Sequence, residues 1–212
     1  MAGRFEHGYP EVYVFPIMNI LVLAPQPFYQ ERGTPIAVDL MVRTLCERGH
    51  AVDLLVYHEG ADVAYEGLTL HRIPAFRLLS GVRPGLSLKK IGCDVLMFIK
   101  VVRMIRRNRP DVVHAVEEAA FMAYVVRRIF GIPYIYDMDS SLPDQIVEKF
   151  PLMRPMKRLM WNMLKPVVYH AMLVAPVCEA LAQSVASCEP SRVVILRDVS
   201  LLADDEKRKR PH

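Results

Sequence analysis

The 212-residue sequence lacks the features that would indicate a metal centre, a disulfide framework or a membrane-spanning helix. No apolar run approaches the roughly 18 residues that a spanning helix requires. The four cysteines form no CxxC pair and stand at no metal-ligand spacing with a histidine; they are Cys46, Cys93, Cys178 and Cys188. This spacing indicates reduced, cytosolic thiols, and we expect no metal site.

The sequence also lacks the glycine-rich loops that bind nucleotide phosphates. Gly33 is the only glycine between Gly8 and Gly49, and neither GxGxxG nor GxxxxGK(S/T) occurs. A dinucleotide site or a P-loop ATP site is therefore not expected. Two interpretations of Gly33 stay open: it fits a turn, or it allows a close approach of the backbone to an anion beside a helix N-terminus.

Hydrophobic residues make up 52% of the chain, which excludes disorder and suffices for a sizeable core. Short apolar runs alternate with segments of helical periodicity. The predicted strands are 19–24, 51–57, 68–73, 111–116, 133–137, 171–175 and 192–196. The predicted helices are 35–48, 86–107, 118–130, 155–168 and 179–187.

This alternation predicts an α/β fold, because parallel strands need long crossovers that cover the sheet. We expect a doubly wound, mostly parallel sheet of about seven strands with helices on both faces. The domain should span residues 18–202, after an N-terminal extension (1–17) and before a charged tail (203–212).

Two kinds of signal mark the predicted helix ends. Thr34 before Pro35 is typical of an N-cap followed by the first helical residue. Gly49 and Gly131 follow predicted helices, where a left-handed C-cap is expected.

Ligands of open parallel sheets bind at the carboxyl ends of the strands. In this sequence those positions are rich in polar and acidic residues, whereas the opposite ends are plain turns. The polar positions are Gln26 to Thr34, Glu117, Glu118, Asp137 to Asp144, Glu179, Asp198 and Ser200. The sequence therefore predicts a binding site along this edge.

Several of these residues are candidates for acid-base chemistry. His114 is the histidine nearest this edge, and it fits either a catalytic role or a hydrogen-bonded core position. The pairs Glu117/Glu118 and Asp137/Asp139 supply carboxylates, although neighbouring helix residues and alternate strand residues usually do not converge as a dyad.

The net charge of +4 is unevenly distributed. Residues 86–109 carry a net charge of +6, and residues 151–170 carry four basic residues and no acid. In the second segment one helical face is apolar and is expected to pack on the core, with Met156, Leu159, Met160, Met163, Leu164 and Val167.

Beside this apolar face the second segment carries basic residues and the single tryptophan of the chain. We expect both basic helices to face an anionic membrane through Lys100, Arg103, Arg107, Arg154, Lys157, Arg158, Trp161 and Lys165. The alternative is two solvated helix faces on a core. Nucleic acid is not an expected partner, because aromatic residues interleaved for base stacking are missing.

Four stretches together carry a family likeness: "MNILVLAPQPFYQERGTPIAVDLMVRTLCERGHAVDLLVYHEG", "RPDVVHAVEEAAFMA", "GIPYIYDMDSSLPDQI" and "VVILRDVSLL". From about Met18 to Leu202 the chain resembles the N-terminal Rossmann-like domain of a GT-B glycosyltransferase of family 4. The resemblance implies transfer of a sugar from a nucleotide diphosphate sugar to a glycan or lipid-linked acceptor. It also implies that no cofactor or catalytic metal is tightly bound, and that this domain holds mainly the acceptor.

By the same resemblance, Gly33 matches the loop glycine that approaches the donor phosphate and the acceptor. "DVVHAVEE" matches the family pattern "DVVHxHE", with Val116 in place of the second histidine. The catalytic residues expected on these grounds are His114 and Glu117. The expected substrate-binding residues are Gln26, Arg32, Gly33, Thr34, Glu118, Asp137, Asp139 and Ser140.

The donor-binding domain of such enzymes has no counterpart in this sequence. We therefore expect negligible transfer by this chain alone, which would act with a separately encoded donor half or be a truncated product. A cytoplasmic protein, peripheral on the inner face of the cell membrane, fits these features. The alternative is a non-catalytic Rossmann-like binding or scaffold protein that uses its basic surface.

Overall fold

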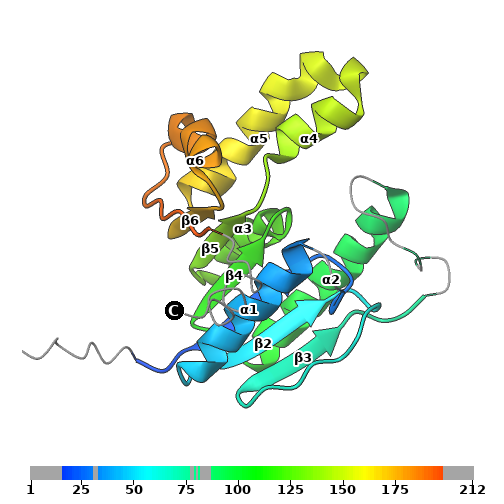
Figure 1. The fold of residues 1–212 in the computed structure, drawn as a ribbon, viewed down its shortest axis with the longest axis vertical. Helices are drawn as coiled ribbons and strands as arrows, with labels where there is room; N and C mark the ends of the chain where they lie inside the picture. The colour runs from blue at the N-terminus through cyan, green and yellow to red at the C-terminus, as the bar shows by residue number, and fades with distance from the viewer. Residues whose placement is uncertain (1–15, 31–32, 77–78, 80, 82–86, 198–212) are drawn as a thin grey trace, which may run out of the picture.

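The computed structural model describes residues 16–30, 33–76, 79, 81 and 87–197. These residues form a six-stranded parallel sheet in the order β3-β2-β1-β4-β5-β6 (Figure 1). The strands are β1 (Asn19–Ala24), β2 (Ala51–Val56), β3 (Leu68–Arg72), β4 (Val112–Val116), β5 (Tyr134–Met138) and β6 (Leu173–Pro176). The predicted α/β class is confirmed, and nearly all of the predicted extension and the whole tail lie outside the described residues.

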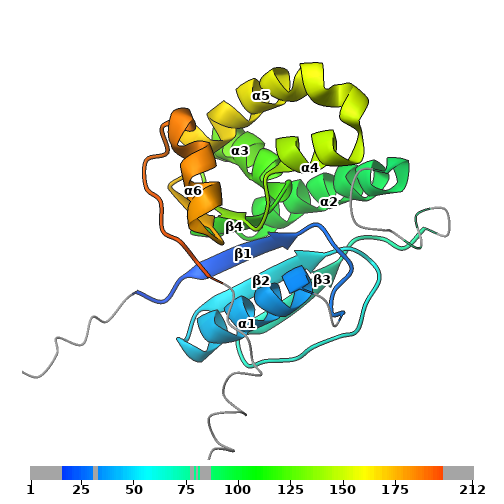
Figure 2. The same ribbon diagram turned by 45° about the horizontal axis from the view of Figure 1, so that its top comes forward.

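Helices cover both faces of the sheet. They are α1 (Gly33–Glu47), α2 (Leu88–Arg107), α3 (Ala119–Phe130), α4 (Leu142–Lys149), α5 (Lys157–Tyr169) and α6 (Glu179–Val185), with the short 3₁₀ helices η2 (Pro151–Met156) and η3 (Ala186–Cys188). Figure 2 shows α1 below the sheet and the other helices above it. The core is accordingly divided into an α1 side and an α2–α3–α5 side.

Strand β1 is the centre of both halves of the core. It pairs in parallel with β2 on one side and β4 on the other. Its side chains alternate between the two faces: Ile20 and Val22 pack on the α1 side, whereas Leu21 and Leu23 pack on the other. Burial of each such side chain stabilises the fold by roughly 1.5–3 kcal/mol.

The predicted seventh strand is only partly formed. Residues 192–196 run beside β6 and make one parallel bridge, Val174 to Val193. The peptide N–H of Val174 donates to Arg192 O at 2.9 Å, and that of Val194 donates to Val174 O at 3.0 Å. The side chains of Val193 and Val194 remain exposed. Because neither face of this segment is buried, it stays a loose edge and the sheet has six strands.

The predicted C-caps are confirmed, whereas the predicted start of the first helix at Pro35, with Thr34 as its N-cap, is two residues too late. Gly49 and Gly131 have φ of 84° and 68°, and the N–H of Gly131 donates to Arg127 O at 2.9 Å. Helix α1 begins at Gly33, so Thr34 and Pro35 both lie inside its first turn. Proline is tolerated there because the first helical N–H groups have no intrahelical acceptor.

Helix α4 was not expected, because the sequence suggested a loop from Asp137 to Asp144. Ser141 caps the helix by accepting a hydrogen bond from the N–H of Asp144 at 3.4 Å, and Pro143 lies in the first turn. A serine followed three residues later by an acid is a helix-start signal, and Pro143 strengthens it. Helix α4 follows the carboxyl end of β5 and lies away from the sheet (Figure 1).

Helix α5 turns a different face toward the core than its periodicity predicts. Leu164 and Val167 are buried as expected, but Leu159 and Met163 are exposed. Trp161, expected on a membrane-facing stripe, packs instead against the core. The N-terminal end of α5 projects beyond the sheet (Figure 1), and the contacts of this helix with the core include Trp161, Leu164 and Val167.

A backbone contact holds together the loops that follow β1 and β2. The N–H of Phe28 donates to Glu59 O at 3.0 Å, and the N–H of Tyr29 donates to Ala61 O at 2.8 Å. Gly60 lies between these contacts with φ of 115°. A Cβ at this position would lie 2.1 Å from the carbonyl oxygen of Phe28, so only glycine fits.

We expect Gly60→Ala to lower the free energy of unfolding by at least about 3 kcal/mol, because it combines a left-handed backbone with a clash against Phe28. Gly49→Ala is the matched control, since Gly49 also has a positive φ but has open space around it. That control should cost only about 1 kcal/mol. Urea unfolding of both variants measures the difference, and equal losses would contradict the backbone contact.

Candidate functional site

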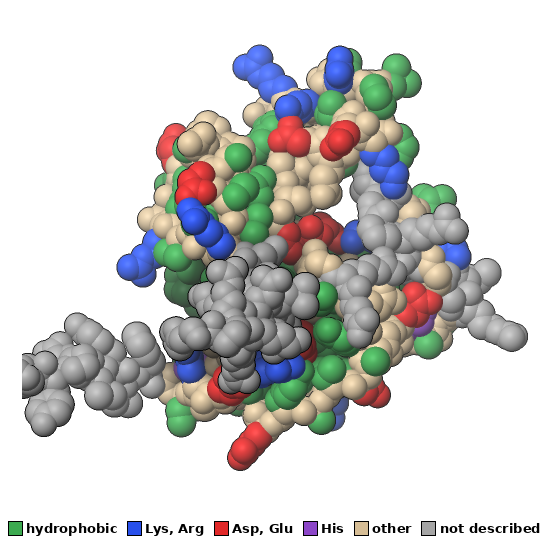
Figure 3. Space-filling model, in the orientation of Figure 1, with side chains coloured by type: hydrophobic (Ala, Val, Ile, Leu, Met, Phe, Trp, Pro, Cys, Tyr) green, Lys and Arg blue, Asp and Glu red, His purple; other side chains and the backbone are tan. Residues whose placement is uncertain are grey.

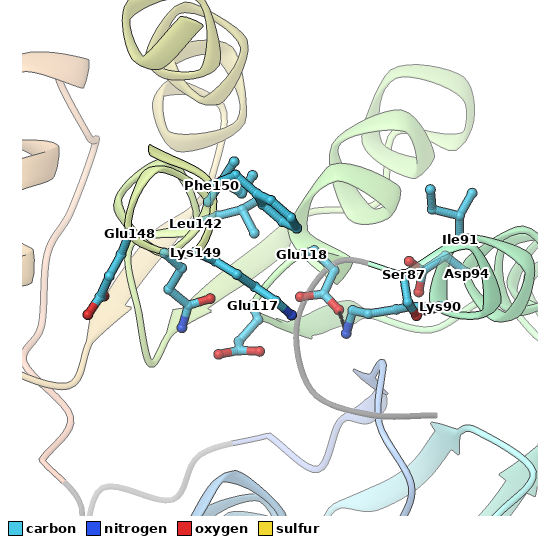
Figure 4. A pocket seen from close by; sticks show the side chains of 12 residues that line it. Ser87, Lys90, Ile91, Asp94, Glu117, Glu118, Leu142, Glu148, Lys149 and Phe150 are labelled. Atoms are coloured by element: carbon cyan, nitrogen blue, oxygen red, sulfur yellow. Dashed lines mark hydrogen bonds and ion pairs between the residues drawn. The ribbon is translucent and has the colours of Figure 1, made fainter. Parts of the chain in front are cut away.

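A cavity of about 380 Å³ lies at the carboxyl end of β4, between α2, the β4–α3 turn and α4 (Figure 4). We refer to it as the α2–α4 cavity. It is lined by Ser87, Lys90, Ile91, Asp94, Glu117, Glu118, Leu142, Gln145, Ile146, Glu148, Lys149 and Phe150. Its wall therefore combines four carboxylates and two ammonium groups with aliphatic and aromatic side chains.

Glu117 occupies an unusual backbone conformation at the end of β4. Its φ of 51° lies in the left-handed region, which non-glycine residues rarely adopt and which often marks functional sites. Its N–H donates to Asp137 O at 2.9 Å, which extends the β4–β5 ladder by one hydrogen bond. The chain then turns at once into α3, so the Glu117 side chain lines the α2–α4 cavity and not the α1 face.

The carboxylate of Glu117 is held and perturbed by its neighbours. Ser140 Oγ donates to Glu117 Oε1 at 3.1 Å. Burial, together with the adjacent Glu118, raises the pKa of Glu117, although Ser140 and Lys90 partly oppose this. A carboxyl group with a raised pKa is better suited to accept and return a proton near neutral pH than an ordinary surface glutamate.

Lys90 connects three segments at this edge. Its ammonium group donates to Pro25 O, after β1, at 3.2 Å. The same group forms an ion pair with Glu118, after β4. Figure 4 shows this pair, with Lys149 extending from α4 toward Glu117 and Glu118. Both lysines thus point into a cluster of acids, and they offset part of its negative charge.

Asp94 and Tyr57 form a buried pair behind Lys90. Tyr57 Oη donates to Asp94 Oδ1 at 2.5 Å. Burial raises the pKa of Asp94 to about 6, against the lowering effect of the Tyr57 hydrogen bond. Burial and the Asp94 charge also raise the pKa of the Tyr57 phenol. Asp94 is therefore a second carboxyl group of this cavity whose pKa is raised.

The structure separates the two expected catalytic residues. His114 is buried on the α1 face of the sheet, where its Nε2–H contacts Asp137 Oδ2 at 2.9 Å. It lines none of the cavities described in this section. Val116, in the position of the second histidine of the family pattern, is part of the α1-side core. Of the two, only Glu117 faces the α2–α4 cavity.

The expected substrate-binding residues also fall into separate places. Glu118 lines the α2–α4 cavity, and Ser140 reaches it through Glu117. A second cavity of about 510 Å³, on the α1 face, is lined by Gly33, Asp137 and Asp139.

The loop after β1 holds the remaining expected substrate-binding residues. Thr34 lies in the first turn of α1, and Arg32 is outside the described residues. Gln26 keeps its Nε2 buried without a hydrogen-bond partner.

The residues of the α2–α4 cavity that sequence reasoning missed include Lys90, Asp94, Lys149 and Phe150. Lys90 and Asp94 are one helical turn apart, and this i, i+4 pairing was available as a signal. This pairing was overlooked because residues 86–109 were interpreted as a basic surface segment. Lys149 and Phe150 belong to the unexpected α4 and its C-terminus.

The residues expected to face a membrane do not form a single surface. Lys100, Arg103 and Arg107 line a cavity of about 510 Å³ beside Asp53 and His71. The ammonium group of Lys100 donates to Arg72 O, and burial lowers its pKa, so this lysine does not face outward.

On the other basic segment, two lysines are paired with acids. Lys157 forms an ion pair with Asp144 at 2.5 Å, and Lys165 pairs with Glu189 at 3.6 Å. The side chain of Trp161 is directed to the core. Arg154 and Arg158 are exposed, as expected.

Within the described residues, no three or more His, Cys, Asp or Glu side chains are grouped as a metal site would require. No helix in this part of the chain has the length and hydropathy needed to span a bilayer.

The sequence matches the family described as the glycosyl transferase 4-like domain over residues 32–197. This match covers most of the sequence, and the chain belongs to that family. No curated protein matches the chain. The family resemblance inferred from the sequence motifs is thereby confirmed.

Solved glycosyltransferase structures share the fold. Sucrose-phosphate synthase from Thermosynechococcus elongatus has a TM-score of 0.62 at 14% identity, over 91% of this chain and 53% of that one. Arabidopsis thaliana UGT89C1 complexed with quercetin has a TM-score of 0.55 at 14% identity, over 93% of this chain and 56% of that one. The calicheamicin glycosyltransferase CalG4 has a TM-score of 0.57 at 12% identity, over 87% and 54%.

The chain thus spans about half the length of each of these proteins. At such low identity the likeness establishes the fold alone. That fold is the N-terminal Rossmann-like domain of GT-B glycosyltransferases.

The raised pKa of Asp94 predicts a specific pH dependence of stability. The folded chain holds this proton up to about pH 6, whereas the unfolded chain releases it near 3.8, so the contribution of Asp94 to stability falls as pH rises between these values. The free energy of unfolding of Asp94→Asn, compared with that of the unmodified chain, should therefore be higher by about 2 kcal/mol at pH 7.5 than at pH 4.5. Urea unfolding at both pH values measures this gain, and parallel pH profiles would show that Asp94 is not perturbed.

Proposed function

We propose that this chain is the acceptor-side part of a glycosyltransferase that moves a sugar from a nucleotide diphosphate sugar to a glycan or lipid-linked acceptor. The observation that carries the proposal is Glu117, a partly buried carboxylate with a strained backbone that lines the α2–α4 cavity at the carboxyl end of β4. The family membership of the chain agrees with this role.

The lining of the α2–α4 cavity suits a sugar better than a phosphate. Carboxylate oxygens accept hydrogen bonds from hydroxyl groups, and charge-assisted hydrogen bonds are the stronger ones. Phe150 adds an apolar surface on which the C–H face of a sugar ring can rest. Four carboxylates against two lysines make the cavity net acidic, which disfavours a phosphate anion. The acceptor is accordingly a hydroxyl-bearing molecule.

Glu117 is the group best placed to take the proton of an acceptor hydroxyl. Its raised pKa improves the match to a proton transfer near neutral pH. Ser140 fixes one of its oxygens, which leaves the other for the acceptor. Bond formation between the acceptor oxygen and the sugar carbon releases the nucleotide diphosphate, and the hydroxyl proton passes to Glu117.

The donor would approach from the side of Gly33. A Cβ at this position would meet nothing within 4 Å, so the packing of the chain itself does not require glycine there. A ligand that needs the space is one reason for such a residue, and the N-terminus of α1 favours an anionic diphosphate. UGT89C1, which shares the fold, has been solved with UDP and with UDP-L-rhamnose. The remaining donor contacts would come from residues beyond this chain.

One observation favours the second candidate, a non-catalytic binding or scaffold protein. The cavity beside Lys100, Arg103 and Arg107 is basic and lies on the α2 side of the sheet, apart from the α2–α4 cavity. Such a cavity suits an anionic partner and has no evident part in sugar transfer. Glycan binding at the α2–α4 cavity would distinguish the enzyme domain from this alternative.

We expect the purified 212-residue chain to transfer no sugar from UDP-glucose, UDP-galactose or GDP-mannose to a panel of oligosaccharides. The departing diphosphate needs nearby cations, and the α2–α4 cavity is net acidic. Mass spectrometry of the oligosaccharides after incubation measures this. Glycosylated product from the chain alone would show that it is a complete catalyst.

The same chain should nevertheless retain glycans on an array. Glu117→Gln should weaken that retention about tenfold, because a charge-assisted hydrogen bond is replaced by a neutral one. Glu66→Gln, at an exposed glutamate before β3, is the matched control and should bind like the unmodified chain. Equal retention by Glu117→Gln, or no retention by any form, would overturn the assignment of the cavity to the acceptor.

A further inference from the structure

The segment that follows α4 carries an exposed apolar stripe. Four side chains of η2 and α5 are open to solvent: Leu152 is 93% exposed, Met156 46%, Leu159 52% and Met163 58%. Met156, the N-cap of α5, is followed by Leu159 and Met163 at spacings of three and four residues, which places these three along one side of the helix; Leu152 precedes them in η2. In Figure 1 this part of the chain projects beyond the sheet, so the fold itself does not cover the stripe.

The surroundings of the stripe are basic. Arg154 and Arg158 lie between its members in the sequence and are both exposed. No acidic residue occurs from position 151 to 170. Figure 3 shows Lys and Arg side chains beside hydrophobic ones at this end of the molecule. The acids nearest in the sequence belong to α4: Asp144 is paired with Lys157, and Glu148 lines the α2–α4 cavity.

This combination fits a lipid surface. Isolated leucine and methionine side chains insert between lipid headgroups, while arginines beside them bind the phosphates of anionic lipids. The flexible methionine side chain adapts to such an irregular environment. The pairing of exposed apolar side chains with a segment of net positive charge therefore points to an anionic surface as the occupant.

We propose that Leu152, Met156, Leu159 and Met163, with Arg154 and Arg158, form a docking surface for an anionic lipid bilayer. The protein lies on the bilayer through this surface and does not span it. Arg154 and Arg158 were expected from the sequence to face a membrane. Met156, Leu159 and Met163 were expected to pack on the core, and Trp161 and Lys100, which were expected to face the membrane, are turned inward.

The docking surface adjoins the α2–α4 cavity. Helix α4 supplies Leu142, Glu148 and Lys149 to the cavity wall and continues directly into η2, which carries Leu152. If the cavity holds the acceptor, as proposed above, the acceptor is a lipid-linked molecule whose polar part enters the cavity while its lipid stays in the bilayer. This second step rests on the proposed function, whereas bilayer docking does not.

Vesicle sedimentation with the full chain tests the docking surface. Vesicles of phosphatidylcholine with 30% phosphatidylglycerol should bind the chain at least tenfold more strongly than phosphatidylcholine alone, and 0.5 M NaCl should weaken that binding. Leu159→Gln combined with Met163→Gln should reduce binding at least tenfold. Arg154→Gln with Arg158→Gln should remove the preference for the anionic lipid.

Ile17→Gln is the matched control, because Ile17 is 76% exposed and lies before β1, remote in sequence from the stripe. This variant should bind vesicles like the unmodified chain, and circular dichroism should show that all variants fold. Absence of vesicle binding, or equal loss of binding in the control, overturns the proposal. Self-association that Leu159→Gln with Met163→Gln abolishes, without vesicle binding, also overturns it and identifies a protein interface.

The outcome is separable from that of the glycan experiment. Loss of vesicle binding with intact glycan retention would reject the docking surface and leave the acceptor cavity in place. Vesicle binding without glycan retention would reject the acceptor cavity and leave the docking surface in place.

Discussion

The parallel pairing of β1 with β2 and β4 is the constraint on which the rest of the structure depends. Strand β1 is hydrogen-bonded along both edges and buried on both faces. Parallel neighbours cannot be joined by tight turns, so the connections are long, and all of them except the β2–β3 loop contain a helix. Because all six strands point the same way, the crossovers bring every strand end with its polar loop to one edge.

The order in which strands are added to the sheet reverses at β1: β2 and β3 lie on one side of it, and β4, β5 and β6 lie on the other. The candidate site lies at this point of reversal. From β1 the chain moves outward to β3, then returns through α2 to β4 on the other side. The loops after β1 and β4 therefore diverge and leave space between them. Lys90 spans that space by contacting Pro25 and Glu118. Its positive charge lies among several acids, which partly offsets the cost of burying Glu117.

Local patterns in the sequence were sufficient to predict most strands and helices. They failed where tertiary packing determines which side chains are buried or brought together. The apolar runs identified β1 to β6, and Gly49 and Gly131 marked two helix ends correctly. Helix α5 is apolar over much of its circumference, so periodicity alone did not distinguish buried Leu164 from exposed Leu159. The strand-end rule found Glu117 and Glu118. It did not find Lys90 and Asp94, which come from a crossover helix that is remote in sequence and that only the tertiary fold brings to this edge.

Helix α4 joins the α2–α4 cavity to the docking surface, and this has a consequence for the choice of acceptor. The helix lines the cavity from Leu142 to Lys149, and after Phe150, which also lines the cavity, the chain enters η2 with the exposed Leu152. If both proposals hold, this arrangement keeps the acceptor cavity close to the bilayer at a fixed separation. It would select acceptors by the distance between their reactive hydroxyl and their lipid, in addition to the identity of their sugars.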